Sequence, residues 1–331
     1  MSTPTSSGTA PLRLGTRGSA LATTQSGHVA RRLTELLGRE VELVRVRTEG
    51  DVKTGSLASL GGTGVFVTAL REALLQGRCD VAVHSLKDLP TTQPDDLTVV
   101  TPEREDPRDA LCARDGLTLE TLPRGARIGT GSPRRAAQLR AARPDAEVVD
   151  IRGNVETRLA RALGPDADLD AVVLAYAGLA RLERTAVVSE VLDPIVVAPA
   201  PGQGALAVEA RTADLAPGTV LADAFAALDH RPTRLAVLAE RAVLARLEAG
   251  CAAPIGALAR VDAGELQLAA VVARVDGTEQ LRHDAATDLV PDDHAAQDAA
   301  ALALGVRVAE ALLAEGAARL APLVGGAPEP S

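Results

Sequence analysis

Apolar residues in the first hundred positions recur in two alternating patterns, one typical of strands and one typical of helices. The predicted strands are residues 12–14, 41–47 and 80–84, and the predicted helices are residues 20–37 and 65–76. The polar, glycine-rich stretch 48–64 is predicted to be a loop. This alternation predicts a parallel α/β sheet whose ligands bind at the carboxyl ends of the strands.

The same alternation returns after a charged linker at residues 102–109. The predicted strands of this second unit are 126–129, 147–150 and 171–174, and its predicted helices are 133–142, 154–163 and one from residue 176. A proline-rich stretch at residues 198–202 follows. Because two linkers bracket one α/β unit, we expect the chain to leave its first domain and to return to it through residues 204–209.

The pattern changes in the last third of the chain. From about residue 223 it predicts two helices, three alternating strands (256–261, 265–274 and 279–283) and a long helix from residue 294. This order is typical of a small α+β domain. The predicted domains are residues 11–103 with 202–222 (α/β, discontinuous), residues 104–201 (α/β), and residues 223–331 (α+β).

Composition narrows the class of protein. The 331 residues carry a net charge of −9 and are 46% apolar, as in an ordinary globular protein. No apolar run approaches the ~20 residues of a membrane span. An acidic chain with only three aromatic residues lacks the surface typical of nucleic-acid binding. Three cysteines, an odd number, and the absence of a secretory pattern at the start predict a cytoplasmic protein.

Arginines gather at turns that follow predicted strands. Arg134 and Arg135 follow a Ser-Pro pair, in which the serine suits a helix N-cap and the proline suits the first helical position. Free N–H groups and two guanidiniums at one helix start predict an anion site. Arg152 and Arg158 occupy the next strand-to-helix turn, at the same sheet edge. The alternative is a set of solvated arginines in first helical turns.

A nucleotide site is a second alternative for the same turn. Gly129 and Gly131, with Asp150 about twenty residues later, imitate a dinucleotide fingerprint. However, the third glycine position of that fingerprint is Arg134, whose side chain would prevent close helix–strand packing. The glycine pattern therefore disfavours nucleotide binding.

Lys87 and Asp88 leave the carboxyl end of a predicted strand, where catalytic groups of open α/β sheets collect. Of 35 basic residues only Lys53 and Lys87 are lysine, so Lys87 departs from the bias of this chain. A carboxylate at this place can stabilise a developing positive charge or carry protons to and from a reacting amine. The alternative is a capping aspartate beside an exposed lysine. His84 is expected to be buried and hydrogen-bonded, without a chemical role.

Cys251 lies in a turn of small residues, Glu248-Ala249-Gly250-Cys251-Ala252-Ala253-Pro254-Ile255-Gly256. A thiolate is a strong nucleophile, so this residue is a candidate for covalent attachment, although a buried apolar cysteine is an equally good interpretation. Cys79 and Cys112 adjoin apolar strand patterns and are expected to be inert. The sequence has no CxxC motif or histidine cluster, so no metal site is predicted.

Together these motifs resemble the porphobilinogen deaminase family, from about residue 12 to the end of the third domain. The resemblance depends on the order and spacing of eight segments: Gly15-Thr16-Arg17-Gly18-Ser19, Gly50-Asp51, Val83-His84-Ser85-Leu86-Lys87-Asp88, Arg104-Glu105-Asp106-Pro107-Arg108-Asp109-Ala110, Gly131-Ser132-Pro133-Arg134-Arg135, Arg152-Gly153-Asn154-Val155, Gly202-Gln203-Gly204-Ala205 and Glu248-Ala249-Gly250-Cys251.

The resemblance implies two α/β domains like those of type II periplasmic binding proteins, plus a small C-terminal α+β domain that carries the cofactor-attachment cysteine. It also implies a covalent dipyrromethane cofactor, one per chain, attached through a thioether to Cys251. Four porphobilinogen molecules would be added head to tail with loss of ammonia, until water releases hydroxymethylbilane for tetrapyrrole and haem biosynthesis. Every pyrrole ring carries an acetate and a propionate, so an arginine-rich site suits the elongating polypyrrole. The family also suggests a monomer.

The resemblance assigns roles by matching position. Asp88 would be the catalytic carboxylate. The other cofactor-binding residues would be Cys251, Lys87, Ser132, Arg134, Arg135, Arg152 and Gln203, and the substrate-binding residues would be Arg17, Ser19, Phe66, Arg158 and Arg181. The chain departs from the family at Ser59 and Thr63, where many members have lysines, and Lys53 is a possible replacement.

The main competing hypothesis is a two-lobed anion-binding protein without catalysis. It accounts for the paired α/β units and for the clustered arginines. It does not account for Cys251, for the third domain or for the missing secretory pattern, so the enzyme is the favoured interpretation.

Overall fold

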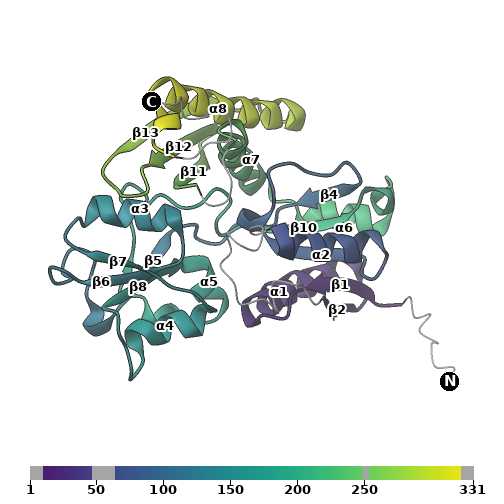
Figure 1. The fold of residues 1–331 in the computed structure, drawn as a ribbon. Coiled ribbons are helices and arrows are strands. Elements are labelled where there is room, and N and C mark those ends of the chain that lie inside the picture. Colours follow the sequence, from purple (N-terminus) through teal and green to yellow (C-terminus); the bar gives the residue numbers. More distant parts are fainter. Residues whose placement is uncertain (1–9, 47–63, 249–252, 322–331) are drawn as a thin grey trace.

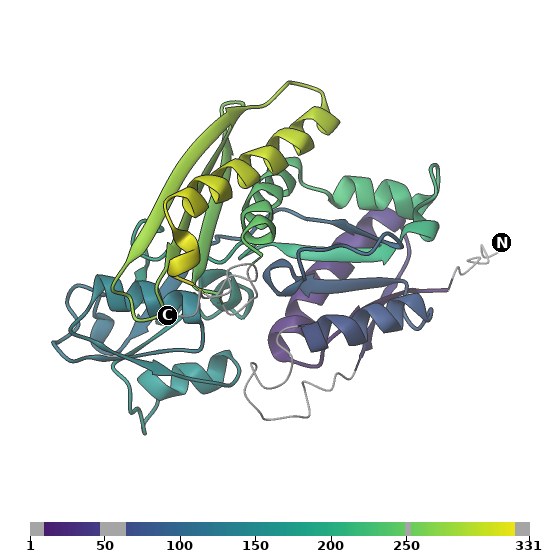
Figure 2. The ribbon, with the colours of Figure 1, turned by 45° about the horizontal axis from the view of Figure 1, so that its top comes forward.

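The computed structural model describes residues 10–46, 64–248 and 253–321, with side chains from residue 67 onward in the second range. Three sheets, each with its own helices, form three units that meet at the centre of the molecule (Figures 1 and 2). Two of the sheets have five strands and the third has three. Two mixed α/β sheets and one antiparallel sheet with helices confirm the predicted fold class.

The first sheet has the strand order β2-β1-β3-β10-β4. Its strands are β1 (Leu12–Thr16), β2 (Val41–Arg45), β3 (Val81–Ser85), β4 (Leu97–Val100) and β10 (Leu206–Arg211), and its helices are α1 (Ala20–Leu37), α2 (Gly64–Leu75) and α6 (Val220–Leu228). Val81 and Val83 face the core that contains α1 and α6, whereas Ala82 between them packs with α2. The helices therefore cover both faces of the sheet, as the alternation of side chains along β3 requires.

The second sheet repeats this plan with the order β7-β6-β8-β5-β9. Its strands are β5 (Asp109–Ala113), β6 (Arg127–Thr130), β7 (Glu147–Asp150), β8 (Ala171–Ala175) and β9 (Glu190–Val191), and its helices are α3 (Pro133–Ala142), α4 (Val155–Leu163) and α5 (Tyr176–Arg181). α3 packs on one face through Leu139, and α4 and α5 pack on the other through Leu159 and Leu179.

Both α/β sheets are mixed, which corrects the prediction of parallel sheets. β10 runs antiparallel to β3 and β4, and β5 runs antiparallel to β8. β10 lies in the first sheet although more than a hundred residues separate it from β4. The chain crosses between the two sheets at residues 102–108 and 198–205, which are called the first and the returning crossing segments. The sequence predicted a return through residues 204–209, but it did not predict the antiparallel pairing of β10 with β3 and β4.

The third unit packs α7 (Arg231–Arg246) and α8 (His294–Ala314) against β11 (Ile255–Asp262), β12 (Glu265–Ala273) and β13 (Gln280–Asp288). The sequence predicted two helices before these strands in the same domain. The structure divides those helices, because Phe225 and Leu228 of α6 are buried in the core of the first sheet, whereas α7 belongs to the third core.

One buried carboxylate joins the three units where the chain crosses between them. Glu240 of α7 is 0% exposed and accepts hydrogen bonds from Arg104 Nη1 (2.6 Å) and Nη2 (3.0 Å). It also accepts from the N–H groups of Gly202 (2.6 Å) and Ala259 (2.8 Å). Arg104 Nε donates to the carbonyl of Gln203 (2.7 Å), so both crossing segments are fixed to α7 and β11.

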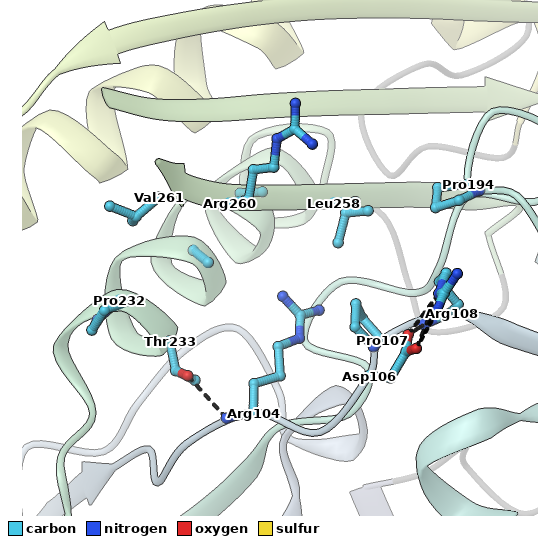
Figure 3. A pocket seen from close by; sticks show the side chains of 12 residues that line it. Arg104, Asp106, Pro107, Arg108, Pro194, Pro232, Thr233, Leu258, Arg260 and Val261 are labelled. Carbon is cyan, nitrogen blue, oxygen red and sulfur yellow. Dashed lines mark hydrogen bonds and ion pairs between the residues drawn. The ribbon is translucent and has the colours of Figure 1, made fainter. Parts of the chain in front are cut away.

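A cavity of about 350 Å³ lies beside this junction, between the first crossing segment, α7 and β11 (Figure 3). Most of its lining is apolar, from residues such as Pro107, Ala236 and Leu258. Figure 3 shows the Arg108 guanidinium folded against the Asp106 carboxylate, at 2.6 Å. Because its charged groups are already bonded, the cavity offers no evident chemistry, and the candidate site lies elsewhere.

Gly204 is required where the two crossing segments touch. Its φ is +86°, and a Cβ there would collide with the Glu105 carbonyl. We expect Gly204→Ala to lower the free energy of unfolding by about 3 kcal/mol, the sum of backbone strain and a backbone clash. Gly218→Ala is the matched control, since its φ is +82° with nothing within 4 Å, and should cost about 1 kcal/mol. Equal losses in denaturant titrations would contradict the close approach.

Candidate active site

The turn after β6 and the turn after β7 lie in contact. Ser132 begins α3 as the N-cap, and its Oγ accepts a hydrogen bond from the Arg135 N–H (3.4 Å). A Cβ on Gly131 would collide with the carbonyl of Ile151, so only glycine lets the two turns approach this closely. The turn that carries Arg134 is therefore held beside the turn that leads to Arg158.

Arg134 and Arg135 share a carboxylate that the sequence analysis did not identify as part of the site. Asp109, at the start of β5, is 0% exposed, and the two arginines are 4% and 5% exposed. Asp109 Oδ1 accepts from Arg135 Nη2 (2.7 Å) and Nε (3.0 Å), and Oδ2 lies 2.8 Å from Arg134 Nη2. Burial would raise the pKa of Asp109, but the two guanidiniums and the amide of Gln203 lower it to about 2. The carboxylate is ionised at every pH of interest.

Gln203, which the resemblance assigned to the cofactor, belongs to the same cluster. Its Nε2 donates to Asp109 Oδ1 (2.7 Å) and to the Pro107 carbonyl (2.7 Å), and the side chain is buried. Arg135 Nη2 also donates to its Oε1 (3.3 Å). The returning crossing segment thus contacts the start of α3.

Lys87 and Asp88 form a short 3-10 turn after β3, at the end of the first sheet. Burial lowers the pKa of Lys87 to about 8, with a further contribution from the charge of Arg135 and smaller opposing ones from Asp88 and Asp109. Because the charges of Arg135 and Arg134 act on Lys87, the end of β3 must lie near the start of α3. Among the described residues, the Asp88 carboxylate has no hydrogen bond or salt bridge.

Arg158 extends the positive charge of the cluster. It is partly buried, and burial followed by the charges of Arg135 and Arg152 lowers its pKa. Its Nε donates to the carbonyl of Gly153 (2.8 Å), and within the described ranges no carboxylate forms a salt bridge with it. Arg152 is exposed and lies 3.1 Å from Asp150. The guanidinium of Arg158 is therefore available to an anionic ligand.

The other residues assigned by resemblance lie at three places. Arg17 and Ser19 follow β1, the parallel neighbour of β3, so they share a sheet edge with Lys87; Ser19 caps α1 through the N–H of Ala22 (3.3 Å). Arg181 is at the crossing segments, where its Nη2 donates to the Gly204 carbonyl (2.6 Å) and it lines a second cavity of about 350 Å³. Outside the described residues lie Cys251, Lys53, Ser59, Thr63 and the side chain of Phe66.

Two buried groups confirm the expected structural roles. Cys79 and Cys112 are 0% exposed, and burial raises the pKa of both thiols, that of Cys112 to about 12. His84 Nε2 lies 2.9 Å from Glu209 Oε2, and Glu209 also pairs with Arg71 Nη2 at 2.6 Å. Burial opposes ionisation of Glu209, but its hydrogen bonds lower its pKa to about 2. His84 is a buried core residue beside the Glu209 carboxylate, and the two thiols are poor nucleophiles.

In the three described ranges, no group of His, Cys, Asp and Glu side chains could hold a metal ion. None of the helices described there has the length and apolar character needed to cross a bilayer.

The fold and this cluster define a three-unit α/β protein that presents several cations and one carboxylate to an anionic ligand. Two family models match the chain: "Porphobilinogen deaminase, dipyromethane cofactor binding domain" over residues 12–217 and "Porphobilinogen deaminase, C-terminal domain" over residues 234–314. The chain belongs to the porphobilinogen deaminase family. Its activity is that of porphobilinogen deaminase with a dipyrromethane cofactor, in tetrapyrrole biosynthesis, and its substrate is porphobilinogen.

Relatives match over most of their length. The porphobilinogen deaminase of Micrococcus luteus is 55% identical, with 96% of each chain covered. That of Cutibacterium acnes is 57% identical over 94% of this chain and 97% of its own. Among solved structures, a periplasmic substrate-binding protein of an ABC transporter from Coxiella burnetii covers 66% of this chain and 91% of its own, with 15% identity and a TM-score of 0.39.

Proposed function

We propose that Asp88 is the catalytic carboxylate and that the surrounding cations bind the acid side chains of cofactor and substrate. The observation that carries this proposal is that the end of β3 lies near the Arg134–Arg135–Asp109 cluster. The charges of Arg135, Asp88, Asp109 and Arg134 all act on the Lys87 ammonium, and a Cβ on Gly202, the neighbour of Gln203, would lie 3.5 Å from the backbone nitrogen of Lys87. A group of partly or fully buried cations that outnumber their carboxylates is stabilised by an anionic ligand.

The residues present fit a dipyrromethane. Arg134 Nε is buried without a hydrogen-bond partner among the described residues, and Arg158 has no carboxylate partner there. Both guanidiniums suit ring acetates and propionates. When bound, the cofactor would supply a covalently held primer to which substrate rings are joined. Its proposed ligands are the thiol of Cys251 and the side chains of Lys87, Asp88, Ser132, Arg134, Arg135, Arg152 and Gln203.

The proposed role of Asp88 is to act on the substrate. An ionised carboxylate can accept a hydrogen bond from a pyrrole N–H and stabilise the cation that porphobilinogen forms when ammonia leaves. The same group can carry the proton that the departing amine takes. Lys87 is charged below pH 8, so at neutral pH it can bind a ring carboxylate while Asp88 faces the ring nitrogens.

The growing product gains two carboxylates with each ring. We propose that Arg17, Ser19, Phe66, Arg158 and Arg181 hold substrate and the elongating polypyrrole. Arg158 suits this role because the charges of Arg135 and Arg152 act on its guanidinium, so all three lie near one another. Arg181 lies at the crossing segments, and ligand binding would require its guanidinium to leave the Gly204 carbonyl.

Attachment through Cys251 is supported by elimination. Cys79 and Cys112 are fully buried with raised pKa values, so neither presents a thiolate. Cys251 is the third cysteine of the chain. It follows α7 in the sequence, and α7 is fixed to both crossing segments through Glu240.

The organisation around this site is also proposed. Domain 1 would comprise residues 11–103 with 202–222, domain 2 residues 104–201 and domain 3 residues 223–331. Helix α6 crosses the boundary at residue 223 and packs in the core of the first sheet. We propose a cytoplasmic monomer; reduced, buried Cys79 and Cys112 suit a reducing compartment. Sedimentation velocity would test the oligomeric state.

Intact-mass spectrometry tests the proposal directly. The purified protein should exceed the mass of its polypeptide by one dipyrromethane, and brief exposure to porphobilinogen should add a ladder of single pyrrole units. A bare polypeptide mass in an active preparation would contradict covalent priming, and a ladder absent from active protein would contradict stepwise addition.

Arg134→Leu should weaken binding while leaving the fold in place. Loss of one charged hydrogen-bonding partner costs about 1.5–3 kcal/mol, so the KM for porphobilinogen or the adduct stability should worsen about 10- to 100-fold. Asp109 retains Arg135 as its partner. Arg127→Leu is the control, because Arg127 is an arginine of the same unit at the opposite, amino end of β6. Unchanged kinetics in Arg134→Leu would remove Arg134 from the site.

A further inference from the structure

Asp109 is a buried carboxylate that contacts the proposed ligand-binding side chains. The carboxylate is 0% exposed, and all of its described partners are members of the cluster: Arg134, Arg135 and Gln203. These partners come from α3 and from the returning crossing segment, whereas Asp109 begins β5. One side chain therefore connects three segments behind the site.

The geometry leaves Arg135 little freedom. Its Nε and Nη2 both donate to Asp109 Oδ1, Nη2 also donates to Gln203, and Nη1 donates to the Val173 carbonyl at 3.3 Å. Arg134 is held by Asp109 on one nitrogen and by the Ala198 carbonyl on another, while its Nε has no described partner. Asp109 thus fixes both guanidiniums, while the buried Nε of Arg134 keeps one N–H that no described residue accepts.

The positive charges of the cluster also require the Asp109 carboxylate. Two adjacent guanidiniums are buried, the partly buried Lys87 ammonium lies near them, and without a counter-charge these cations would repel one another. The groups that face Lys87 are Arg134, Arg135, Asp88 and Asp109, and of the two carboxylates only Asp109 is paired with the arginines.

We propose that Asp109 is a positioning residue of the deaminase: it fixes Arg134 and Arg135 for the carboxylates of the dipyrromethane, and its charge keeps the neighbouring cations, including Lys87, together. This inference rests on the proposed function of Arg134, Arg135 and Lys87 as anion ligands. Asp109 acts only through these side chains, since it is itself enclosed by them.

Asp109→Asn tests the charge and keeps the shape. In the native protein kcat should fall as pH rises through about 8, because Lys87 loses its proton. Removal of the Asp109 charge lowers the pKa of Lys87 further. The fall of kcat at alkaline pH, which is the alkaline limb of the pH–rate profile, should therefore move to lower pH by about one unit. The fraction of purified chains carrying the dipyrromethane, read by intact mass, should fall as well. The proposal would be overturned if Asp109→Asn kept both the native pH of the alkaline limb and the native fraction of chains that carry dipyrromethane.

Asp109→Glu tests the geometry and keeps the charge. The extra methylene displaces the carboxylate, so occupancy should fall while the alkaline limb stays at its native pH. This variant also decides the question if Asp109→Asn does not fold. Native occupancy in Asp109→Glu would then overturn the positioning role.

Glu209→Gln is the matched control. Glu209 is equally buried and paired with an arginine, but it lies in the first sheet and contacts Arg71 and His84. Its loss should lower thermal stability without moving the limb or the occupancy; a limb shift as large as that of Asp109→Asn would overturn the proposal. Failure of the proposed function is distinguishable, because the kinetics of Arg134→Leu would then be those of the native protein.

Discussion

Cys251→Ala is expected to give a folded protein without dipyrromethane and without turnover. The thiol is the proposed attachment atom, and the other two cysteines are fully buried with raised pKa values, so neither can replace it. Without a covalent primer each chain would begin from free porphobilinogen, and bilane formation should fall at least about 10³-fold. The measurements are intact mass, the Ehrlich colour of dipyrroles, and product formation.

Cys112→Ala is the matched control for this experiment. It removes a thiol from β5 and costs stability through a small cavity, but it should retain the full adduct mass and the Ehrlich response. If Cys251→Ala kept the adduct, another nucleophile would hold the cofactor. If it lost the adduct but kept native turnover, covalent priming itself would be wrong.

Much of the fold follows from local signals in the sequence. The helices at 20–37 and 133–142 and the strand at 147–150 have the predicted bounds. Ser19 and Ser132 cap the two helices through their side-chain oxygens, which is why their first residues were predictable. Elements with clear apolar spacing and a capping residue need no information from the rest of the chain.

The elements that were not predicted depend on distant partners. β5 and β10 lack a clear alternation of apolar and polar residues: β5 is apolar after Asp109, and β10 is interrupted by Glu209. They pair antiparallel with β8 and β3, and no hairpin turn joins either pair. α6 has an apolar face suited to either neighbouring core, and only the tertiary fold places Phe225 in the first one. Their positions are set by the two crossings at residues 102–108 and 198–205.

The candidate site shows the same division. The sequence predicted that the turns carrying Arg134 and Arg158 lie at one sheet edge, since strand-to-helix turns of neighbouring parallel strands meet there. In the structure these two turns touch at Gly131 and Ile151, and the charge of Arg135 acts on Arg158. It did not predict Asp109, although this residue stands in a quoted motif, because its pairing with Arg135 spans 26 positions. A useful signal was available: two buried arginines require a buried counter-charge, and Asp109 directly precedes the apolar run of β5.

Asp88→Asn is expected to stop turnover while leaving folding and cofactor attachment largely intact. The substitution keeps the size of the side chain and removes the charge that stabilises the cation formed when ammonia leaves. General acid–base and electrostatic contributions of one such group are about 10²–10⁴-fold, so kcat should fall by this factor. Asp88 forms no hydrogen bond or salt bridge among the described residues, so its loss should cost little stability. Single-turnover kinetics and intact mass separate these effects.

Asp95→Asn serves as the control, because Asp95 is an exposed aspartate shortly after the same turn. It removes one negative charge near the first sheet and should leave kcat within about twofold of the native value, since exposed charges are screened by solvent. If Asp88→Asn also retained near-native kcat, the cation would be stabilised by another group, and Asp88 would be a ligand of the cofactor without a part in the reaction. If Asp88→Asn lost the adduct as well as turnover, the Asp88 carboxylate would be needed already for assembly of the dipyrromethane primer.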